Sequence, residues 1–163
     1  MKKNPSFKLW AVSAALVCAA WGQGASAATA NGTANASVLT PIAITAGQTL
    51  EFGAFAANGA GTVAVDTASA RTSTGSVVLA NSTYRAGTFN VAGTGNATFA
   101  ITYPGAFTIS NGAQTMSVLV NGAATGTLAS GSATVNVGGT ATVAANQAAG
   151  AYTGTYTMTV EYN

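Results

Sequence analysis

Apolar and hydroxyl-bearing residues alternate with a period of two along much of this chain of 163 residues. Near the C-terminus, the apolar residues fall on one parity and threonines on the other. The apolar set comprises Tyr152, Tyr156, Met158, Val160 and Tyr162. Because successive side chains of a β-strand point to opposite faces, this alternation predicts a strand with one buried and one solvated face.

Similar short runs predict further strands over most of the chain. They cover residues 34–45, 50–56, 62–66, 76–80, 88–92, 98–103, 116–120, 134–137 and 140–144. No stretch after the first 27 residues combines helical periodicity with caps. Many short strands at this spacing predict an all-β fold, an antiparallel β-sandwich of immunoglobulin-like shape.

Turn-forming pairs separate several of these runs. Asn58-Gly59, Asn111-Gly112 and Asn121-Gly122 suit tight turns, because Asn and Gly tolerate positive φ. Gly138-Gly139 lies between two valine-bearing runs and predicts a hairpin loop. Residues 93–98 have the look of a phosphate-binding loop, but a predicted strand follows them where such a loop opens a helix, so they predict a hairpin turn.

The abundance of Gly, Ser and Thr could also describe a disordered chain. Bulky anchors that such tracts lack argue for a packed core. They are the five tyrosines together with Phe52, Phe55, Phe89, Phe99 and Phe107.

The first 27 residues carry the three parts of a secretory signal peptide. Three lysines, Lys2, Lys3 and Lys8, precede the apolar residues 9–20, and Ala25-Ser26-Ala27 forms an A-x-A cleavage site. The sequence thus predicts a cleaved leader over residues 1–27 and one domain over 28–163, with no second stretch of membrane-spanning length. We expect export to the periplasm and then to the cell surface or the medium.

Charge and chemistry are sparse after the leader. Residues 28–163 contain only five charged side chains: Arg71, Arg85, Glu51, Asp66 and Glu161. Their net charge is −1, so the predicted domain has no basic patch for nucleic acid. The sequence has no histidine, and residues 28–163 have neither Cys nor Lys, which removes Ser-His and Cys-His nucleophiles, Schiff-base lysines and His/Cys metal sites. We therefore expect no enzyme, metal or cofactor, with the carboxylates as surface charge and Asp66 beside a turn.

The C-terminal strand resembles that of chaperone–usher pilins. Gly150 lies fourteen residues from the end, Tyr156, Met158 and Val160 alternate, and Tyr162 is next to last. In such pilins a periplasmic chaperone pairs with this strand, and the N-terminal segment of the next subunit then completes the sheet. The resemblance implies as partners a chaperone, an outer-membrane usher and further copies of the chain in a head-to-tail polymer.

The start of the predicted domain, residues 28–45, has the alternation that a donor strand needs. The residues on the apolar parity are Ala34, Ala36, Val38, Ile42 and Ile44. Two interpretations stay open: this run completes a neighbour's sheet, or it is the first strand of its own sandwich.

A broader resemblance covers most of residues 28–163. Leu50-Glu51-Phe52-Gly53, residues 61–63 leading to Arg71, residues 89–93 and residues 149–156 resemble landmarks of the secreted bacterial family named domain of unknown function 4402. The label of that family implies no activity.

Two functions from different classes follow. The first is a structural subunit of a fimbrium-like surface fibre or adhesin, assembled by strand complementation. The alternative is a free-standing secreted module that binds protein or carbohydrate through aromatic residues such as Tyr84, Tyr103 and Phe107, of which Phe107 also suits the core.

Overall fold

The computed structural model describes residues 26–163, so most of the predicted leader, residues 1–25, lies outside the described residues. The described chain divides into residues 26–36 and the unit Ser37–Asn163. Residues 26–36 are exposed and form no strand. The unit Ser37–Asn163 contains ten strands, and no helix occurs between residues 26 and 163, which confirms the all-β prediction.

The strands follow one another in this order: β1 (Ala43–Ala46), β2 (Phe55–Val65), β3 (Arg71–Leu79), β4 (Gly87–Ala92), β5 (Thr98–Thr102), β6 (Phe107–Ser110), β7 (Thr115–Gly122), β8 (Thr125–Thr127), β9 (Ser132–Val143) and β10 (Thr159–Tyr162). All pairings between them are antiparallel.

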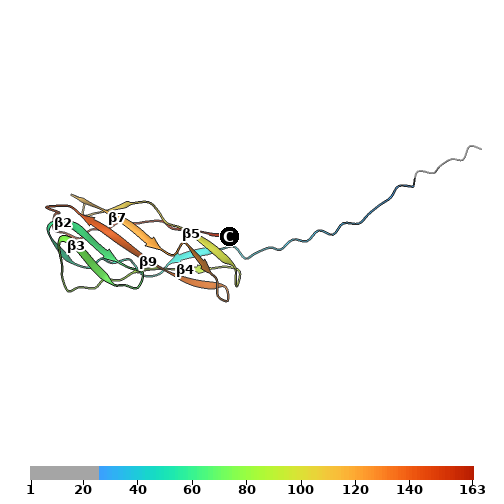
Figure 1. The fold of residues 1–163 in the computed structure, drawn as a ribbon, viewed down its shortest axis with the longest axis horizontal. Coiled ribbons are helices and arrows are strands. Elements are labelled where there is room, and N and C mark those ends of the chain that lie inside the picture. The colour runs from blue at the N-terminus through green and yellow to red at the C-terminus, as the bar shows by residue number, and fades with distance from the viewer. Residues whose placement is uncertain (1–25) are drawn as a thin grey trace, which may run out of the picture. The chain divides into compact units, whose positions relative to one another are not determined.

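The long strand β9 organises the larger sheet, whose main order is β1-β4-β9-β2-β3. Its first half pairs with β4, and its second half pairs with β2 and with β7. Figure 1 shows β9 between β2 and β7. β6 extends the sheet from β7. A second sheet of three strands has the order β10-β5-β8.

The two sheets share one hydrophobic core, which confirms a β-sandwich. Phe99 of β5 and Val118 of β7 are both fully buried in it, as is Leu128 just after β8. Burial along β7 alternates strictly, with Met116, Val118 and Val120 inside, as the period of two requires. The immunoglobulin-like arrangement of the strands stays a prediction.

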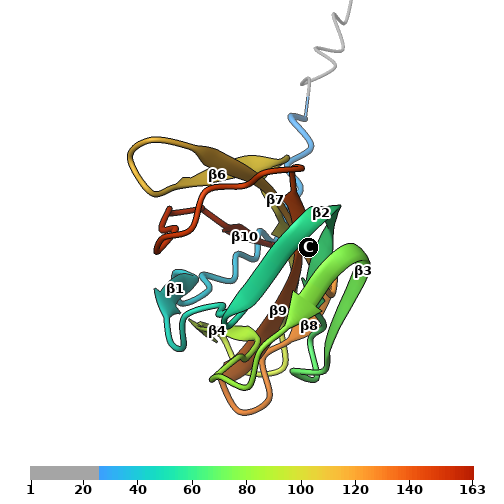
Figure 2. The ribbon, with the colours of Figure 1, turned by 90° about the vertical axis from the view of Figure 1, so that its left-hand side faces the viewer.

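The C-terminal alternation is confirmed residue by residue. Tyr152, Tyr156, Met158, Val160 and Tyr162 are buried or half-buried, and the threonines between them are exposed. Only Thr159–Tyr162 forms a ladder, however, because residues 154–158 make no backbone hydrogen bond to another strand, although Gly154 lies against Thr108 and Ile109 of β6. Figure 2 shows this C-terminal segment, in red, between β6 and β1.

Two of the predicted turns are wrong. Gly138-Gly139 lies inside β9, and neither glycine has a positive φ. A side chain on Gly138 would collide with the backbone of Val65, so the glycines permit close approach of two strands. Asn58-Gly59 lies inside β2, where the register against β3 shifts between Ala57 and Gly61.

The turn predicted at Asn111-Gly112 is confirmed. Gly112 has a φ of 90°, and the side-chain oxygen of Asn111 accepts the backbone N–H groups of Ala113 and Gln114. Asn121-Gly122, by contrast, ends β7 itself, and the link to β8 follows it.

Several predicted boundaries also need correction. Residues 93–98 do form a turn, but it connects β4 to β5 across the two sheets and is no hairpin. The run 34–45 forms a strand only over Ala43–Ala46, and only the last two residues of the run 50–56 belong to β2. The pattern did not predict β6 or β8, which are three or four residues long.

Candidate functional site

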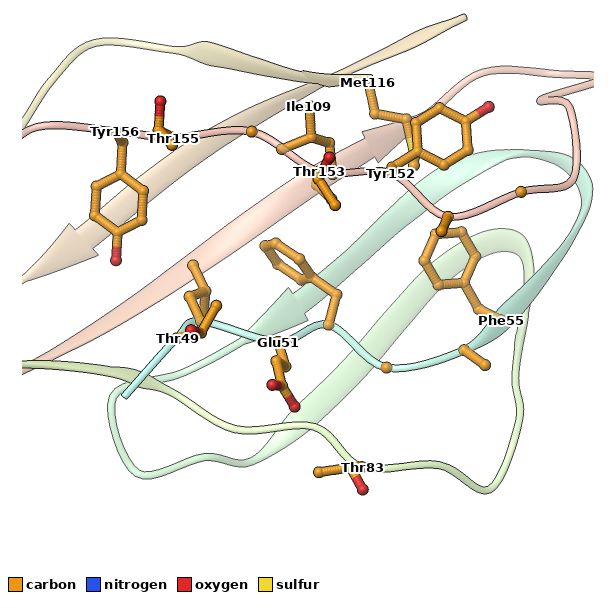
Figure 3. A pocket seen from close by; sticks show the side chains of 18 of the residues that line it. Thr49, Glu51, Phe55, Thr83, Ile109, Met116, Tyr152, Thr153, Thr155 and Tyr156 are labelled. Atoms are coloured by element: carbon orange, nitrogen blue, oxygen red, sulfur yellow. The ribbon is translucent and has the colours of Figure 1, made fainter. Parts of the chain in front are cut away.

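An open apolar groove of about 1120 Å³ lies within the unit Ser37–Asn163. Its walls are residues 46–57, which we call the N-terminal wall, and residues 147–156, which we call the C-terminal wall. Figure 3 shows the two walls facing each other across the gap, with Phe55 and Tyr156 directed into it. The floor consists of side chains from four strands: Phe89, Phe107, Ile109, Met116 and Ala141.

The N-terminal wall is fixed along its outer edge by β4 and the loop before it. The N–H of Gly47 donates to Thr88 O at 2.8 Å, and Glu51 and Arg85 exchange two backbone hydrogen bonds of 2.9 and 3.0 Å. Arg85 Nη2 also lies 2.7 Å from Glu51 Oε1. The side chain of Arg85 is 43% exposed and that of Glu51 is 34% exposed, so this ion pair contributes only about 0–1 kcal/mol to the stability of the fold.

Arg71 at the start of β3 holds the middle of the N-terminal wall. Its Nη1 donates to Phe52 O at 3.1 Å, and its Nη2 donates to Ala80 O at 2.6 Å. The guanidinium also stacks on the Tyr84 ring, 4.3 Å from its centroid. A side chain on Gly53 (φ 69°) would strike Arg71, so glycine is required there.

The C-terminal wall is anchored mainly at one end. The N–H of Gln147 Nε2 donates to Tyr152 Oη at 2.8 Å, and Tyr152 Oη donates to Ala148 O at 2.8 Å. Thr153 and Ser110 then exchange two backbone hydrogen bonds of 2.8 and 3.0 Å. Beyond this bridge, residues 154–158 form no backbone–backbone hydrogen bond within the described chain.

Tyr156 marks the end of the groove nearer to β10. Its ring meets Phe89 edge-on, with centroids 5.8 Å apart, and lies tilted against Phe107 at 5.2 Å. Its hydroxyl lies against Gly87 on the far side of the groove. Burial raises the pKa of Tyr156 above its usual 10.0, and nearby Tyr103 raises it further.

The groove has the form of a sandwich that lacks one strand. On the N-terminal wall, residues 55–57 pair with β3 alone, because β2 meets β9 only from Gly61 onward. On the C-terminal wall, residues 154–158 are unpaired. Two free backbone edges therefore flank an apolar floor, which is the geometry that accepts an added strand.

The sequence profile of a family described as Domain of unknown function (DUF4402) matches residues 42–162. The chain belongs to this family. No curated protein and no solved structure matches it. The matched residues include β1, both walls and all of β10, so the groove lies within the DUF4402 domain.

The predicted contact strand of this DUF4402 domain spreads over the groove and the core. Gly150 and Tyr156 line the groove, and Met158 is buried in the hydrophobic core. Val160 and Tyr162 belong to β10, where they pair with Ile101 and Phe99 of β5.

The predicted donor residues fall into two sets. Ala34, Ala36 and Val38 are exposed and lie in no strand, and Val38 is 95% exposed. Ile42 and Ile44 are half-buried against the domain's own core, and Ile44 pairs with Val91 of β4. The part of the run from Ile42 onward thus belongs to its own sandwich.

Sequence reasoning missed the groove and most of its walls. From the sequence, Phe52 and Phe55 are predicted core anchors, and Phe52 and Arg71 resemble family landmarks, but none of them is placed beside a groove. Of the aromatics considered for ligand binding, Tyr84 is 41% exposed but covered on one face by Arg71, and Phe107 packs against the core. Tyr103 donates to Ala123 O at 2.9 Å.

Residues 26–163 hold no group of three His, Cys, Asp or Glu side chains placed to bind a metal ion. Over the same residues, no helix is long and apolar enough to cross a bilayer.

Proposed function

We propose that this DUF4402 protein is a structural subunit of an extracellular fibre or surface adhesin, assembled by strand complementation. In this proposal, residues 28–40 of one molecule lie in the groove of the next as an added β-strand. The observation that supports it is the pair of unpaired backbone edges across an apolar floor. An added strand would supply backbone partners to both edges and side chains to the floor.

An unfilled groove is costly to a free molecule. Open strand edges pair readily with other chains, and proteins usually cover or charge them. Here the walls carry a single charged residue, Glu51, which Figure 3 shows pointing away from the gap. Nothing in the groove therefore repels an incoming uncharged strand.

Residues 28–40 of a second copy match the groove in composition and length. These thirteen residues carry no charge, and the apolar parity Ala34, Ala36 and Val38 is exposed. The walls are twelve and ten residues long, so an extended segment of this length runs along the whole groove. A contact of this kind is head-to-tail and does not close into a ring, which gives a fibre.

The proposal assigns the protein no catalytic activity. Each carboxylate of the described chain has a structural or solvated setting: Glu51 pairs with Arg85, Asp66 accepts the N–H groups of Ala68 and Ala70, and Glu161 is exposed on β10. A periplasmic chaperone and an outer-membrane usher are the partners that the pilin resemblance implies, and the proposal includes them.

The test is assembly of the chain 28–163, expressed with its own leader and run on a denaturing gel with and without boiling. We expect a ladder of oligomers that collapses to monomer on boiling. The control chain Ser37–Asn163 keeps the groove but lacks most of the donor, and should stay monomeric. A soluble, cooperatively unfolding monomer of the longer chain at all concentrations would contradict the proposal and favour a free-standing binding module.

A further inference from the structure

The hydroxyl of Tyr162 ties together two segments that are far apart in the sequence. Tyr162 Oη accepts the N–H of Thr94 at 2.7 Å and donates to Thr40 O at 2.7 Å. The N–H of Thr40 in turn donates to Thr94 Oγ1 at 2.8 Å. Both backbone groups of Thr40 are therefore held by the same small cluster, which we call the Tyr162 latch (Tyr162, Thr94 and Thr40).

Two members of the latch, Tyr162 and Thr94, are held firmly by the rest of the sandwich. Tyr162 pairs with Phe99 in the ladder between β10 and β5, and its ring lies against Gly93 and the hydrophobic core. The turn that carries Thr94 is fixed by the N–H of Asn96, which donates to Leu128 O at 2.7 Å. Thr40 is thus fastened to a firm part of the sandwich.

Thr40 is the point at which the candidate donor meets its own domain. Pro41 follows it, with a fixed φ and no N–H, and Ile42 packs against the core. Before Thr40, Val38 and Leu39 are exposed, and residues 37–41 form no turn. Insertion of the donor into its own groove would have to start from this anchored residue.

Such folding back is the main competitor of polymerisation. A segment tethered to its own groove acts at an effective concentration in the millimolar range, far above that of a second molecule in solution. A subunit that polymerises therefore needs a feature that prevents insertion in cis.

We propose that the Tyr162 latch is such a feature: it holds Thr40 extended, so that residues 28–40 are donated to another molecule and not to their own groove. Tyr162 is then a positioning residue for assembly. The inference rests on the proposed function, since it concerns which groove the same segment fills.

The test distinguishes insertion in cis from insertion in trans by cross-linking. The chain 28–163 has no cysteine, so Asn35→Cys and Thr155→Cys place one thiol on the donor and one on the C-terminal wall. A short bismaleimide, added to purified chain refolded without chaperone, yields a looped monomer for cis insertion and covalent oligomers for trans insertion. Both products separate on a boiled denaturing gel.

We expect mainly oligomers in this background. Tyr162→Phe removes only the hydroxyl and should raise the ratio of looped monomer to oligomer about five- to thirty-fold, the effect of losing one or two hydrogen bonds. Thr94→Ala, which removes the acceptor of the Thr40 N–H, should shift the ratio in the same direction. Tyr103→Phe is the matched control, since its hydroxyl bonds Ala123 O away from Thr40, and should leave the ratio unchanged.

Two results would overturn the inference in different ways. If oligomers form but both latch variants keep the ratio within about twofold of the parent, donation in trans does not depend on the latch and the proposed function survives. If no background gives either product and no boiling-sensitive ladder appears, residues 28–40 fill no groove, and the proposed function fails together with the inference.

Discussion

Strand β9 and residues 154–160, which lead from the C-terminal wall into β10, have a similar alternating sequence but differ in their backbone pairing. The run 140–143 of β9 reads Thr-Ala-Thr-Val, and residues 155–160 read Thr-Tyr-Thr-Met-Thr-Val. The second half of β9 pairs on both edges, with β2 and with β7. Residues 154–158 pair on neither edge within the described chain. Alternation thus specifies which face of a strand is buried and leaves its edges undetermined.

The difference also appears in the packing of side chains. Val137 and Val143 of β9 are at most 1% exposed and do not border the groove. Tyr152 and Tyr156 of the C-terminal wall are half-buried and border the open groove. We therefore expect substitutions around β9 to affect folding, and substitutions around the groove to affect assembly.

The largest effect should come from truncating the closed core. Phe99→Ala leaves a cavity at a fully buried position and should lower the free energy of unfolding by about 3–5 kcal/mol. Phe55→Ala, at a half-buried position that opens to the groove, should cost no more than about 2 kcal/mol and abolish the ladder. Urea unfolding and the gel assay measure the two effects. If Phe99→Ala and Phe55→Ala lowered the free energy of unfolding equally and gave the same ladder of oligomers, the proposed difference between the core and the groove would be wrong.

A smaller effect is expected from Arg71, which shapes the N-terminal wall. Arg71→Lys keeps the charge but loses the forked donors to Phe52 O and Ala80 O. We therefore expect the free energy of unfolding, measured in urea, to fall by about 1.5–3 kcal/mol, and the ladder of oligomers on the gel to weaken. The matched control is Arg85→Lys, whose single exposed pair with Glu51 should change stability by less than about 1 kcal/mol. The same loss in both variants would show that Arg71 does not shape the wall.

The smallest effect is an alkaline loss of stability from the groove tyrosine. The pKa of Tyr156 in the folded chain is raised by burial, so the folded state holds this proton more tightly than the unfolded state. Its contribution to stability is complete below the ordinary pKa of 10.0 and falls as the pH rises through the higher folded value. Tyr156→Phe should reduce the slope of the unfolding free energy above about pH 10. An unchanged slope would contradict this assignment.

The sequence predicted the sandwich because its alternation reports burial directly. The parity of Tyr156, Met158 and Val160 was correct at each position. Turn chemistry was less informative: Asn111-Gly112 forms a turn, whereas Asn58-Gly59 and Gly138-Gly139 lie within strands. Glycine serves a turn and a close approach of strands equally well, and only the neighbouring chain decides between them.

The groove could not be predicted in the same way. It arises because two segments about one hundred residues apart in the sequence face each other without a strand between them. The role of Arg71 in the N-terminal wall could not be predicted either, because its carbonyl partners Phe52 and Ala80 come together only in the fold. A pairing between distant segments also divided the predicted donor run: Ile44 lies in β1 and pairs with Val91 of β4, whereas Ala34, Ala36 and Val38 lie in no strand.

The most direct test of the account is amide hydrogen exchange of the chain Ser37–Asn163, measured with and without a synthetic peptide of residues 28–40. In the free chain, the amides of residues 154–158 should exchange rapidly while those of β9 are protected. Saturating peptide should slow exchange at 154–158 about a hundredfold or more, and a peptide carrying Val38→Asp should not. Protection of 154–158 that is already present without peptide, or that stays absent when the peptide is bound, would contradict the claim that the groove accepts a strand.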